Sequence, residues 1–394
     1  MSDADLYTGR EQTLVKHYIL RQYLERFAII VGTHKDTLTY VDCFSGPWNV
    51  QSEDFKDSSF SIALEQLRKA RRVHQDRTGR TLKLRCLFLE KTRSAFTKLK
   101  QFTDKITDVE IEAQNEKLED AIPLMLEFVK RGGSRSFPFI FIDPTGWTGF
   151  EMSTIAPLLK IEPGEVLINF MTGHIRRFID YPEEVNQQSF VKFFGSGDFG
   201  EKVKGLAQQK REDAAVEEYI RNVKSTGKFS HVCSAIVLHP EIDRTAFHLI
   251  YATRNFAGVE VFKDAEKRAM ALMEKARAEA KQRKREEKTK QKELYPGEDL
   301  HDPVHYTSLR MHYLAKSKQA VLDLIERCNS IPYDQACALT LSFPLSWESD
   351  LKEWIRCWVQ EGLLTMSGLK PRQQVPQRGE GIVLVSRSSM GRPV

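Results

Sequence analysis

The stretch "HVCSAIVLHPEIDRTAFHLIYATRN", residues 231–255, contains two apolar runs joined by a short polar link. Each run has the length and composition of a strand, and the link leaves no room for a helix. A parallel crossover needs about a dozen residues or more, so the two strands are expected to run antiparallel. The stretch therefore predicts an antiparallel pair that ends a sheet begun earlier in the chain.

Five further apolar runs precede this pair, and amphipathic helical patterns lie between them. "FPFIFID", residues 137–143, is unbroken, as expected of a parallel strand covered on both faces. Strands that alternate with helices predict a doubly wound α/β sheet. Five such strands followed by an antiparallel pair is the strand plan of class I methyltransferases, so we predict that Rossmann-like fold. The runs are residues 37–44, 82–90, 109–115, 137–147 and 165–171.

The segment from about Gly258 to Glu293 is rich in Ala, Glu, Lys and Arg and predicts a long helix. Between Lys275 and Lys292 there are nine Lys/Arg against three Asp/Glu, whereas the whole chain carries a net charge of only +5. This half shows almost no apolar stripe, so we expect it to project into solvent or to lie against a charged partner. A surplus of this kind attracts polyanions, although a solvated helix face explains it equally well.

The C-terminal region reads as three helices followed by a strand hairpin. The third helical pattern places Trp354, Ile355 and Trp358 on one apolar face. This outline is that of a winged-helix-like domain, which often binds nucleic acid through its third helix and wing. Acidic residues offset the basic ones on that helix, so packing or partner docking remains an alternative. We expect a methyltransferase-like domain over 1–262, a charged helix and linker over 263–300, and the winged-helix-like domain over 301–394.

Composition excludes several other classes of protein. The chain has 394 residues, and no apolar run approaches the roughly 20 residues that cross a bilayer. The N-terminal stretch is polar and acidic, unlike a signal peptide. The six cysteines form no C-x-x-C pair, so neither a zinc site nor a disulfide framework is indicated. We expect a cytoplasmic protein without a metal site or a membrane partner.

Polar side chains stand at the carboxyl ends of all five parallel strands. In a doubly wound sheet these ends meet at one edge, where ligands bind. Glu90 is placed to accept hydrogen bonds from ribose hydroxyls, Asn115 to contact adenine, and Asp143 to face a substrate. Each also has a structural alternative, since an acid at a strand end often caps the next helix. The five residues are Asp42, Glu90, Asn115, Asp143 and Asn169.

Two histidines, His17 and His174, are candidate bases, although a lone histidine is more often a structural donor. No Ser-His-Asp arrangement can be argued from the sequence. The G-x-G-x-x-G spacing of dinucleotide oxidoreductases is missing as well. These observations favour group transfer over hydride transfer.

Seven short blocks follow one another in the order and spacing found in the three-Cys-motif partner proteins. The chain resembles that family from about Lys16 to Asp264. The resemblance implies a class I methyltransferase fold that uses S-adenosylmethionine (SAM), and a partner with three clustered cysteines, similar to an iron–sulfur, radical-SAM-like protein. The blocks are "DCFSGPW", "SSFSIALE", "FLEKTRSAFTKL", "FIFIDPTGWTGF", "EVLINFM", "FFGSGDF" and "FHLIYATRNFAGVEVFKD".

When the family's motifs are aligned with this sequence by position, the resemblance implies cofactor-binding residues in the first two motifs and at the end of the strand that follows them. Trp48 stands where the family usually has a second glycine, and residues 58–60 stand where it has G-S-P. The implied cofactor contacts are Asp42, Phe44, Gly46, Glu90 and Asn115.

The fourth motif, Asp143-Pro144 followed by Trp147, is similar to the [DN]-P-P-[FYW] signature of amino-methyltransferases that act on bases. There the acid or amide accepts a hydrogen bond from the amine, and the aromatic ring stacks on an extruded base. In this chain the second proline is replaced and the aromatic residue is displaced by one position. We expect Asp143, Pro144 and Trp147 to form the catalytic side of the site.

The sequence thus favours a SAM-dependent methyltransferase acting on nucleic acid together with a three-Cys-motif partner. The alternative is a non-catalytic protein that uses the same fold to dock protein or nucleic acid. Basic residues of the charged helix and of the C-terminal hairpin loop are the candidate nucleic-acid contacts. They are Lys281, Arg283, Lys284, Arg285, Lys370, Arg372 and Arg378.

Overall fold

The structure is a computed structural model, and it describes residues 5–46, 50–144, 146, 150–173, 194, 203 and 205–387. The chain divides into two compact units. The first comprises Met1–Val232 and Ile236–His301, and the second comprises Cys233–Ala235 and Asp302–Val394.

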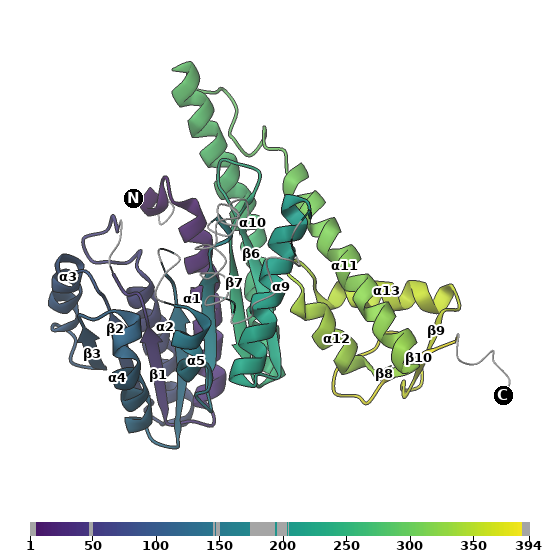
Figure 1. The fold of residues 1–394 in the computed structure, drawn as a ribbon, viewed down its shortest axis with the longest axis horizontal. Coiled ribbons are helices and arrows are strands. Elements are labelled where there is room, and N and C mark those ends of the chain that lie inside the picture. Colours follow the sequence, from purple (N-terminus) through teal and green to yellow (C-terminus); the bar gives the residue numbers. More distant parts are fainter. Residues whose placement is uncertain are drawn as a thin grey trace. The chain divides into compact units, whose positions relative to one another are not determined.

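A seven-stranded sheet forms the centre of the first unit, in the order β3-β2-β1-β4-β5-β7-β6 (Figure 1). β1 to β5 are parallel, and β7 pairs antiparallel to β5 with Asn169 opposite Leu249. The predicted methyltransferase strand plan is therefore confirmed. The strands are β1 (Thr37–Asp42), β2 (Lys83–Leu89), β3 (Glu110–Gln114), β4 (Ser136–Ile142), β5 (Glu165–Phe170), β6 (His231–Leu238) and β7 (Thr245–Thr253).

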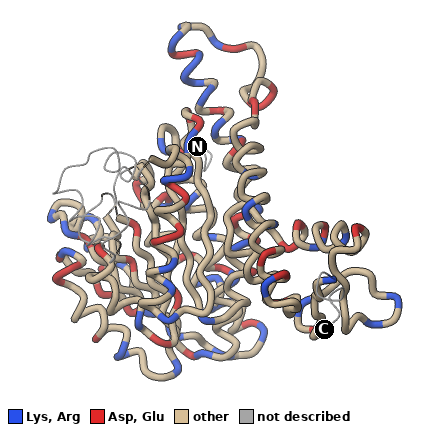
Figure 2. The backbone as a smooth tube through the Cα atoms, turned by 45° about the vertical axis from the view of Figure 1, so that its right-hand side comes forward, with Lys and Arg blue, Asp and Glu red and all other residues tan. Residues whose placement is uncertain are grey.

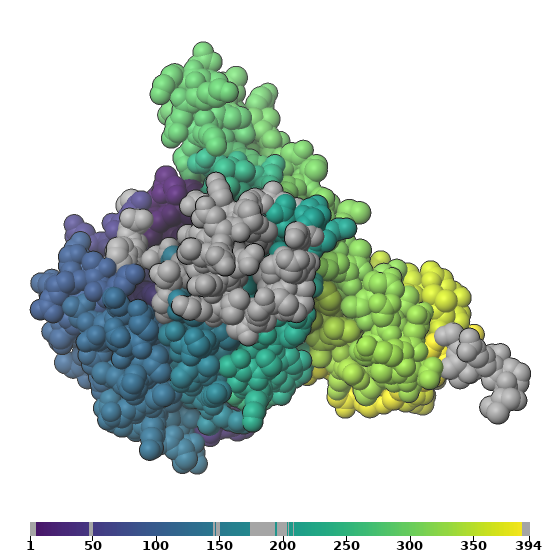
Figure 3. Space-filling model, in the orientation of Figure 1, coloured from purple at the N-terminus to yellow at the C-terminus, as the bar shows by residue number. Residues whose placement is uncertain are grey.

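Helices cover both faces of this sheet (Figure 1). α1 (Glu11–Gly32) packs between α2 (Ser59–Thr78) and α10 (Phe256–Thr289) on one face. α5 (Met152–Leu159) packs between α4 (Leu118–Arg131) and α9 (Gln208–Gly227) on the other, where their apolar residues join those of the strands in one core. α3 (Arg93–Thr103) lies beside β3, and this part of the chain belongs to the blue surface on the left of Figure 3. A short 3₁₀ turn, η1 (Asp5–Tyr7), precedes α1.

The start of α2 is fixed by its own sequence. The hydroxyl of Ser58 accepts a hydrogen bond from the Ser61 backbone N–H, which satisfies one of the otherwise unpaired amides of the first turn. Gly79 ends the helix in a left-handed conformation with φ +69°. This cap places Ser59 directly above the end of β1.

A buried polar cluster secures the amino end of β5. Both oxygens of Glu165 accept hydrogen bonds, one from Tyr23 of α1 and the other from Thr253 of β7 at 2.8 Å. The Tyr23 hydroxyl also lies 2.7 Å from the Tyr251 hydroxyl. Gly258 on α10 packs so closely that a Cβ there would stand 2.2 Å from the Tyr251 hydroxyl. The cluster thereby fixes α1 and α10 against the sheet.

Up to Arg387, where the described residues end, the second unit contains three helices and a three-stranded antiparallel sheet in the order β8-β10-β9. The predicted helices and hairpin are present, and a short strand, β8, was not expected. Trp354 and Trp358 are buried, so these side chains form core rather than an exposed stacking platform. The elements are α11 (Val304–Cys328), β8 (Ser330–Pro332), α12 (Tyr333–Ser342), α13 (Glu348–Gln360), β9 (Leu364–Ser367) and β10 (Val383–Ser386).

None of the helices in the described part of the chain combines the length and apolar composition needed to cross a bilayer. The same residues contain no group of three or more His, Cys, Asp or Glu side chains that could hold a metal ion.

Candidate functional site

A cavity of about 490 Å³ lies at the carboxyl ends of β1, β4 and β5. Its size falls within the range of ordinary small-molecule sites, and its position is where ligands bind in doubly wound sheets. Four other segments complete its wall: the start of α1, the loop before α2, the segment after β5 and the turn between β6 and β7. Lining residues include Arg10, Lys16, His17, Phe44, Gly46, Asp57, Ser59, Asp143, Pro144, Asn169, His239, Arg244 and Phe247.

Three side chains from three elements meet in this cavity. Lys16 of α1 donates to Oδ2 of Asp143, just beyond β4, and the Asn169 amide nitrogen of β5 donates to Oδ1 at 2.6 Å. The side chains of Lys16 and Asp143 are only 11% and 14% exposed, so their ion pair is largely shielded from water. Both oxygens of the predicted catalytic carboxylate are therefore engaged within the chain.

Asp42 organises the loop after β1 from beneath rather than lining the cavity. Its Oδ1 accepts from the Phe44 backbone N–H at 3.1 Å, and its Oδ2 accepts from the Ser59 hydroxyl at 2.7 Å. Full burial, with a smaller contribution from nearby Asp143, raises the pKa of this carboxyl to about 6, although these hydrogen bonds lower it. The result is a fixed path for Phe44 and Gly46, which reach the cavity.

The wall beside α2 depends on a second buried carboxylate, Asp57. Its oxygens accept from Arg10 and from the backbone N–H groups of Gln51 and Ser52 at 2.9 and 3.2 Å. Burial lowers the pKa of Arg10. This ion pair ties the residue before α1 to the loop of residues 50–58, so the two segments form one wall.

His17, one of the candidate bases, lines the cavity and is buried. Its Nδ1 lies 2.9 Å from the Tyr7 hydroxyl. Burial and the neighbouring cations, Lys16 first among them, hold the pKa of His17 well below its usual value. At neutral pH it is therefore an uncharged imidazole, which could accept a proton only weakly.

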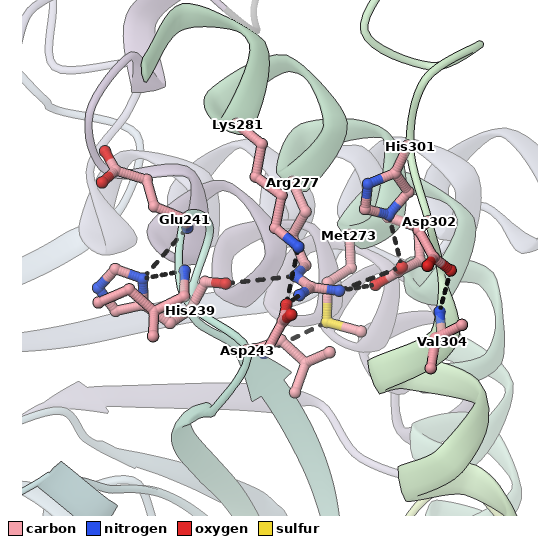
Figure 4. Close-up of polar contacts among 12 residues, drawn as sticks. His239, Glu241, Asp243, Met273, Arg277, Lys281, His301, Asp302 and Val304 are labelled. Atoms are coloured by element: carbon pink, nitrogen blue, oxygen red, sulfur yellow. Dashed lines mark hydrogen bonds and ion pairs between the residues drawn. The ribbon is translucent and has the colours of Figure 1, made fainter. Parts of the chain in front are cut away.

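The turn between β6 and β7 forms the opposite wall, and Arg277 of α10 holds it (Figure 4). The Arg277 side chain is 1% exposed and donates to Asp243 at 2.5 Å, to Glu274 at 2.9 Å and to the His239 carbonyl at 3.3 Å. The Nδ1 atom of His239 accepts two backbone N–H groups of the same turn. These bonds make the turn a fixed part of the site.

Glu90 and Asn115 lie outside this cavity. Glu90 lines a separate hollow of about 20 Å³, and its carboxylate accepts from the Thr92 backbone N–H at 2.5 Å, within the turn that precedes α3. The Asn115 amide donates to the carbonyls of Glu90 and Lys91 at 2.8 and 3.1 Å. Phe44 lines both hollows and is their common wall. The predicted cofactor residues thus form two groups on either side of Phe44.

Trp48, Trp147 and His174 lie outside the described residues, so the structure tests neither the predicted catalytic role of Trp147 nor the direction of Trp48.

Each predicted nucleic-acid contact on α10 has an acidic partner in the same chain. Lys281 pairs with Asp243 at 2.7 Å, Lys284 with Glu241 at 2.9 Å and Arg285 with Glu293 at 2.6 Å. Arg283 pairs with Glu11 at the start of α1. Figure 2 shows acidic and basic residues interspersed along this part of the chain. We expected this half of the helix either to project into solvent or to lie against a charged partner. Up to Arg285 its basic side chains contact charged groups, and those groups belong to the protein itself.

The three basic residues of the C-terminal hairpin loop differ from one another. Lys370 pairs with Glu380 at 2.5 Å. Arg372 is exposed and adopts a positive φ of 69°. Arg378 is only partly exposed. Lys370 and Arg372 are therefore the exposed cations of this set, and Lys370 is engaged in an ion pair.

No family model and no curated protein sequence matches the chain. Two solved structures are similar to it at low identity. A Legionella pneumophila protein described by the family model DUF519 is 10% identical, covers 65% of this chain and 91% of its own, and gives a TM-score of 0.38. A loganic acid methyltransferase solved with SAH is 9% identical, covers 72% and 89%, and gives a TM-score of 0.31. The strand order and register define the fold.

Sequence reasoning missed Lys16, Arg10 and the β6–β7 turn as parts of the site. Lys16 is separated from Asp143 by 127 residues, and nothing in its neighbours along the chain marks it. A usable signal did exist for the turn: it joins the antiparallel pair at the same edge of the sheet as the end of β5.

Proposed function

We propose that the first unit is a SAM-dependent methyltransferase in which cofactor and substrate meet at the cavity. The observation that carries this proposal is the position of the cavity. It lies at the carboxyl edge of a sheet in the methyltransferase strand order, between Gly46 of the first motif and Asp143-Pro144 of the fourth. The loop held by Asp42 and the hollow beside Glu90 flank the same edge.

SAM supplies an already activated methyl sulfonium, so no covalent enzyme intermediate is required. The protein has only to align the reacting groups and to exclude water. Phe44 and Gly46 would contact the cofactor, and Glu90 and Asn115 would lie on its ribose and adenine side. Asp143 would orient the nucleophile from the opposite side.

We further propose a nucleic-acid substrate. Phe44 and Phe247 line the cavity, and Arg244, which is exposed, lies in its wall. Aromatic faces and cations together suit bases and phosphates. The second unit has the order of elements of a winged helix, and Arg372 in its hairpin loop would add a phosphate contact.

Kinship with the three-Cys-motif partner proteins, and with it an iron–sulfur partner, is proposed on the ordered sequence blocks alone. Co-expression of the chain with a three-Cys-motif protein from the same genome, followed by co-purification through either protein, tests it. Separate elution of the two would count against this part and leave the methyltransferase proposal intact.

Calorimetric titration with SAM and SAH tests the central proposal. We expect binding in about the micromolar range, typical of cofactor sites, and its loss in Glu90→Ala. Glu119→Ala, an exposed acid in the first turn of α4, is the matched control and should bind normally. Absence of heat at about millimolar ligand would refute the proposal.

A non-catalytic docking protein is the second candidate. Two observations favour it: both Asp143 oxygens already have partners, and the hollow beside Glu90 has room for little more than water. If this reading is right, SAM does not bind and Glu90→Ala merely removes the bond to the Thr92 backbone N–H.

A further inference from the structure

Asn169 is the side chain that we single out in the cavity. It is the penultimate residue of β5, is only 3% exposed and lines the cavity wall. Its amide nitrogen lies 2.6 Å from Oδ1 of Asp143 and 3.6 Å from the sulfur of Met171. A buried amide in a ligand cavity can read the hydrogen-bonding character of whatever enters.

The orientation of this amide is dictated by chemistry. If it were reversed, its oxygen would stand 2.6 Å from a carboxylate oxygen, acceptor against acceptor. Lys16 secures the arrangement because its ammonium group pairs with Oδ2 of Asp143 and holds the carboxylate in place. Lys16 is therefore a positioning residue, and Asn169 can present only its oxygen to a ligand.

That oxygen has no partner. Asn169 Oδ1 is inaccessible to solvent and makes no hydrogen bond. A buried acceptor without a donor is uncommon in native proteins, because its lost hydration is not replaced. A ligand whose entry moves the atoms that cover this oxygen, and which brings an N–H group to it, would supply the missing bond.

We propose that Asn169 is a specificity-determining residue that selects a nucleobase carrying an amino group, adenine or cytosine, over the corresponding oxo base. Hypoxanthine and uracil present a carbonyl oxygen where adenine and cytosine present an amine. That carbonyl would meet Asn169 Oδ1 as a second acceptor. The inference rests on the proposed function in taking the cavity as the place of a base, but it requires no methyl transfer.

Two substitutions change this selection in different ways. In Asp143→Asn, the new amide accepts from Lys16 through its oxygen and donates through its nitrogen. Asn169 must then turn its oxygen toward residue 143 and its nitrogen toward the ligand, which favours the oxo base. Asn169→Leu removes the acceptor altogether, so the two kinds of base should bind alike.

The experiment is calorimetric titration of the full-length protein with AMP, IMP, CMP and UMP, with and without SAH. We expect AMP to bind at least about tenfold more tightly than IMP, and CMP than UMP, the effect of one satisfied against one opposed hydrogen bond. Asp143→Asn should reverse the order of affinities within each pair. Asn169→Leu should bring the ratio of the two dissociation constants in each pair close to one.

The chain offers a matched control in its second unit. There Lys370 and the Gln373 amide donate to the two oxygens of Glu380, the same arrangement as Lys16 and Asn169 around Asp143. Glu380→Gln should leave every ratio unchanged. Circular dichroism of each variant confirms that it is folded.

Equal binding of amino and oxo nucleotides by the wild type, retention of the amino preference in Asp143→Asn, or no binding of any nucleotide would each overturn the inference. SAM titration separates this result from the proposed function. If SAM binds and amino and oxo nucleotides bind with equal affinity, the proposed role of Asn169 is wrong and the proposed function stands. If SAM does not bind but the ratios hold, the selection stands without the methyltransferase.

Discussion

The Ser59 hydroxyl donates to Oδ2 of Asp42 across 2.7 Å, and this bond joins the first residue of α2 to the last residue of β1. It stabilises the charged form of a carboxylate that burial otherwise disfavours. The pKa of Asp42 thus depends on burial, which raises it, and on the donated hydrogen bonds, which lower it. A change in either should shift this pKa.

Asp42 should make stability depend on pH. Its folded-state pKa of about 6 lies above the ordinary value of 3.8, so the folded protein binds this proton more tightly than the unfolded chain. The stabilisation is fully present below about pH 4 and is lost as pH rises through about 6, a change of roughly 3 kcal/mol by pH 7. In denaturant unfolding at several pH values, the free energy of unfolding of Asp42→Asn should increase relative to that of the wild type as pH rises.

Ser59→Ala should raise the pKa of Asp42 further, because it removes a bond to the charged form. Carbon-13 NMR of labelled aspartate measures this directly. Ser61→Ala, one half-turn along α2, is the control. An Asp42 titration at or below its ordinary range in the wild type would contradict the assignment.

Arg277→Ala should destabilise the first unit by about 3 kcal/mol, since Oε1 of Glu274 and the His239 carbonyl lose their buried donor. Arg277→Lys should recover only part of this loss, because an ammonium group cannot serve three acceptors in the same plane. Thermal unfolding provides the measurement. Arg268→Ala, which breaks an exposed pair with Asp264, should cost no more than about 1 kcal/mol. A similar loss in both alanine variants would argue against the buried role.

Gly258→Ala should also be destabilising, although alanine is the better helix former. The added Cβ would stand 2.2 Å from the Tyr251 hydroxyl and 2.9 Å from Glu165. Relief of this overlap should cost about 1–3 kcal/mol. The loss should shrink in a Tyr251→Phe background, where the nearest atom is absent. Equal losses in the two backgrounds would mean that the strain lies elsewhere.

Nucleic-acid binding, if present, should respond to Arg372 and not to Arg283. Arg283 is committed to Glu11, whereas Arg372 is exposed. Arg372→Gln should lower the slope of log affinity against log salt by about one, and Arg283→Gln should leave it unchanged while lowering the melting temperature. Fluorescence anisotropy with a labelled oligonucleotide at several salt concentrations gives both slopes. Equal slopes in the two variants would show that the loop does not contact phosphate.

The strand plan could be predicted because each strand shows its character locally, in apolar runs such as residues 137–142, and because the short link before Thr245 forces an antiparallel turn. α2 and α9 were not predicted as separate helices. The carboxyl-edge residues were placed correctly as a row. Their grouping into two separate hollows was not predicted. Glu90 bonds to its own turn, Asn115 bonds to that same turn after β2, and the partners of Asp143 come from distant segments. The acids that neutralise α10 likewise lie outside it, so counting charges within the helix overstated its free positive charge.

The cavity wall includes residues from Gly9 to Phe247, and this span has a consequence for biosynthesis. A nascent chain emerges from the ribosome with its first strands available to fold early, yet the wall is incomplete until β7 has emerged and paired with β5. Until then β5 presents an open edge to any other strand nearby. Ligand binding therefore requires that β7 has paired with β5. A ligand of the cavity, added to a translation reaction, should bind only to chains that extend beyond β7.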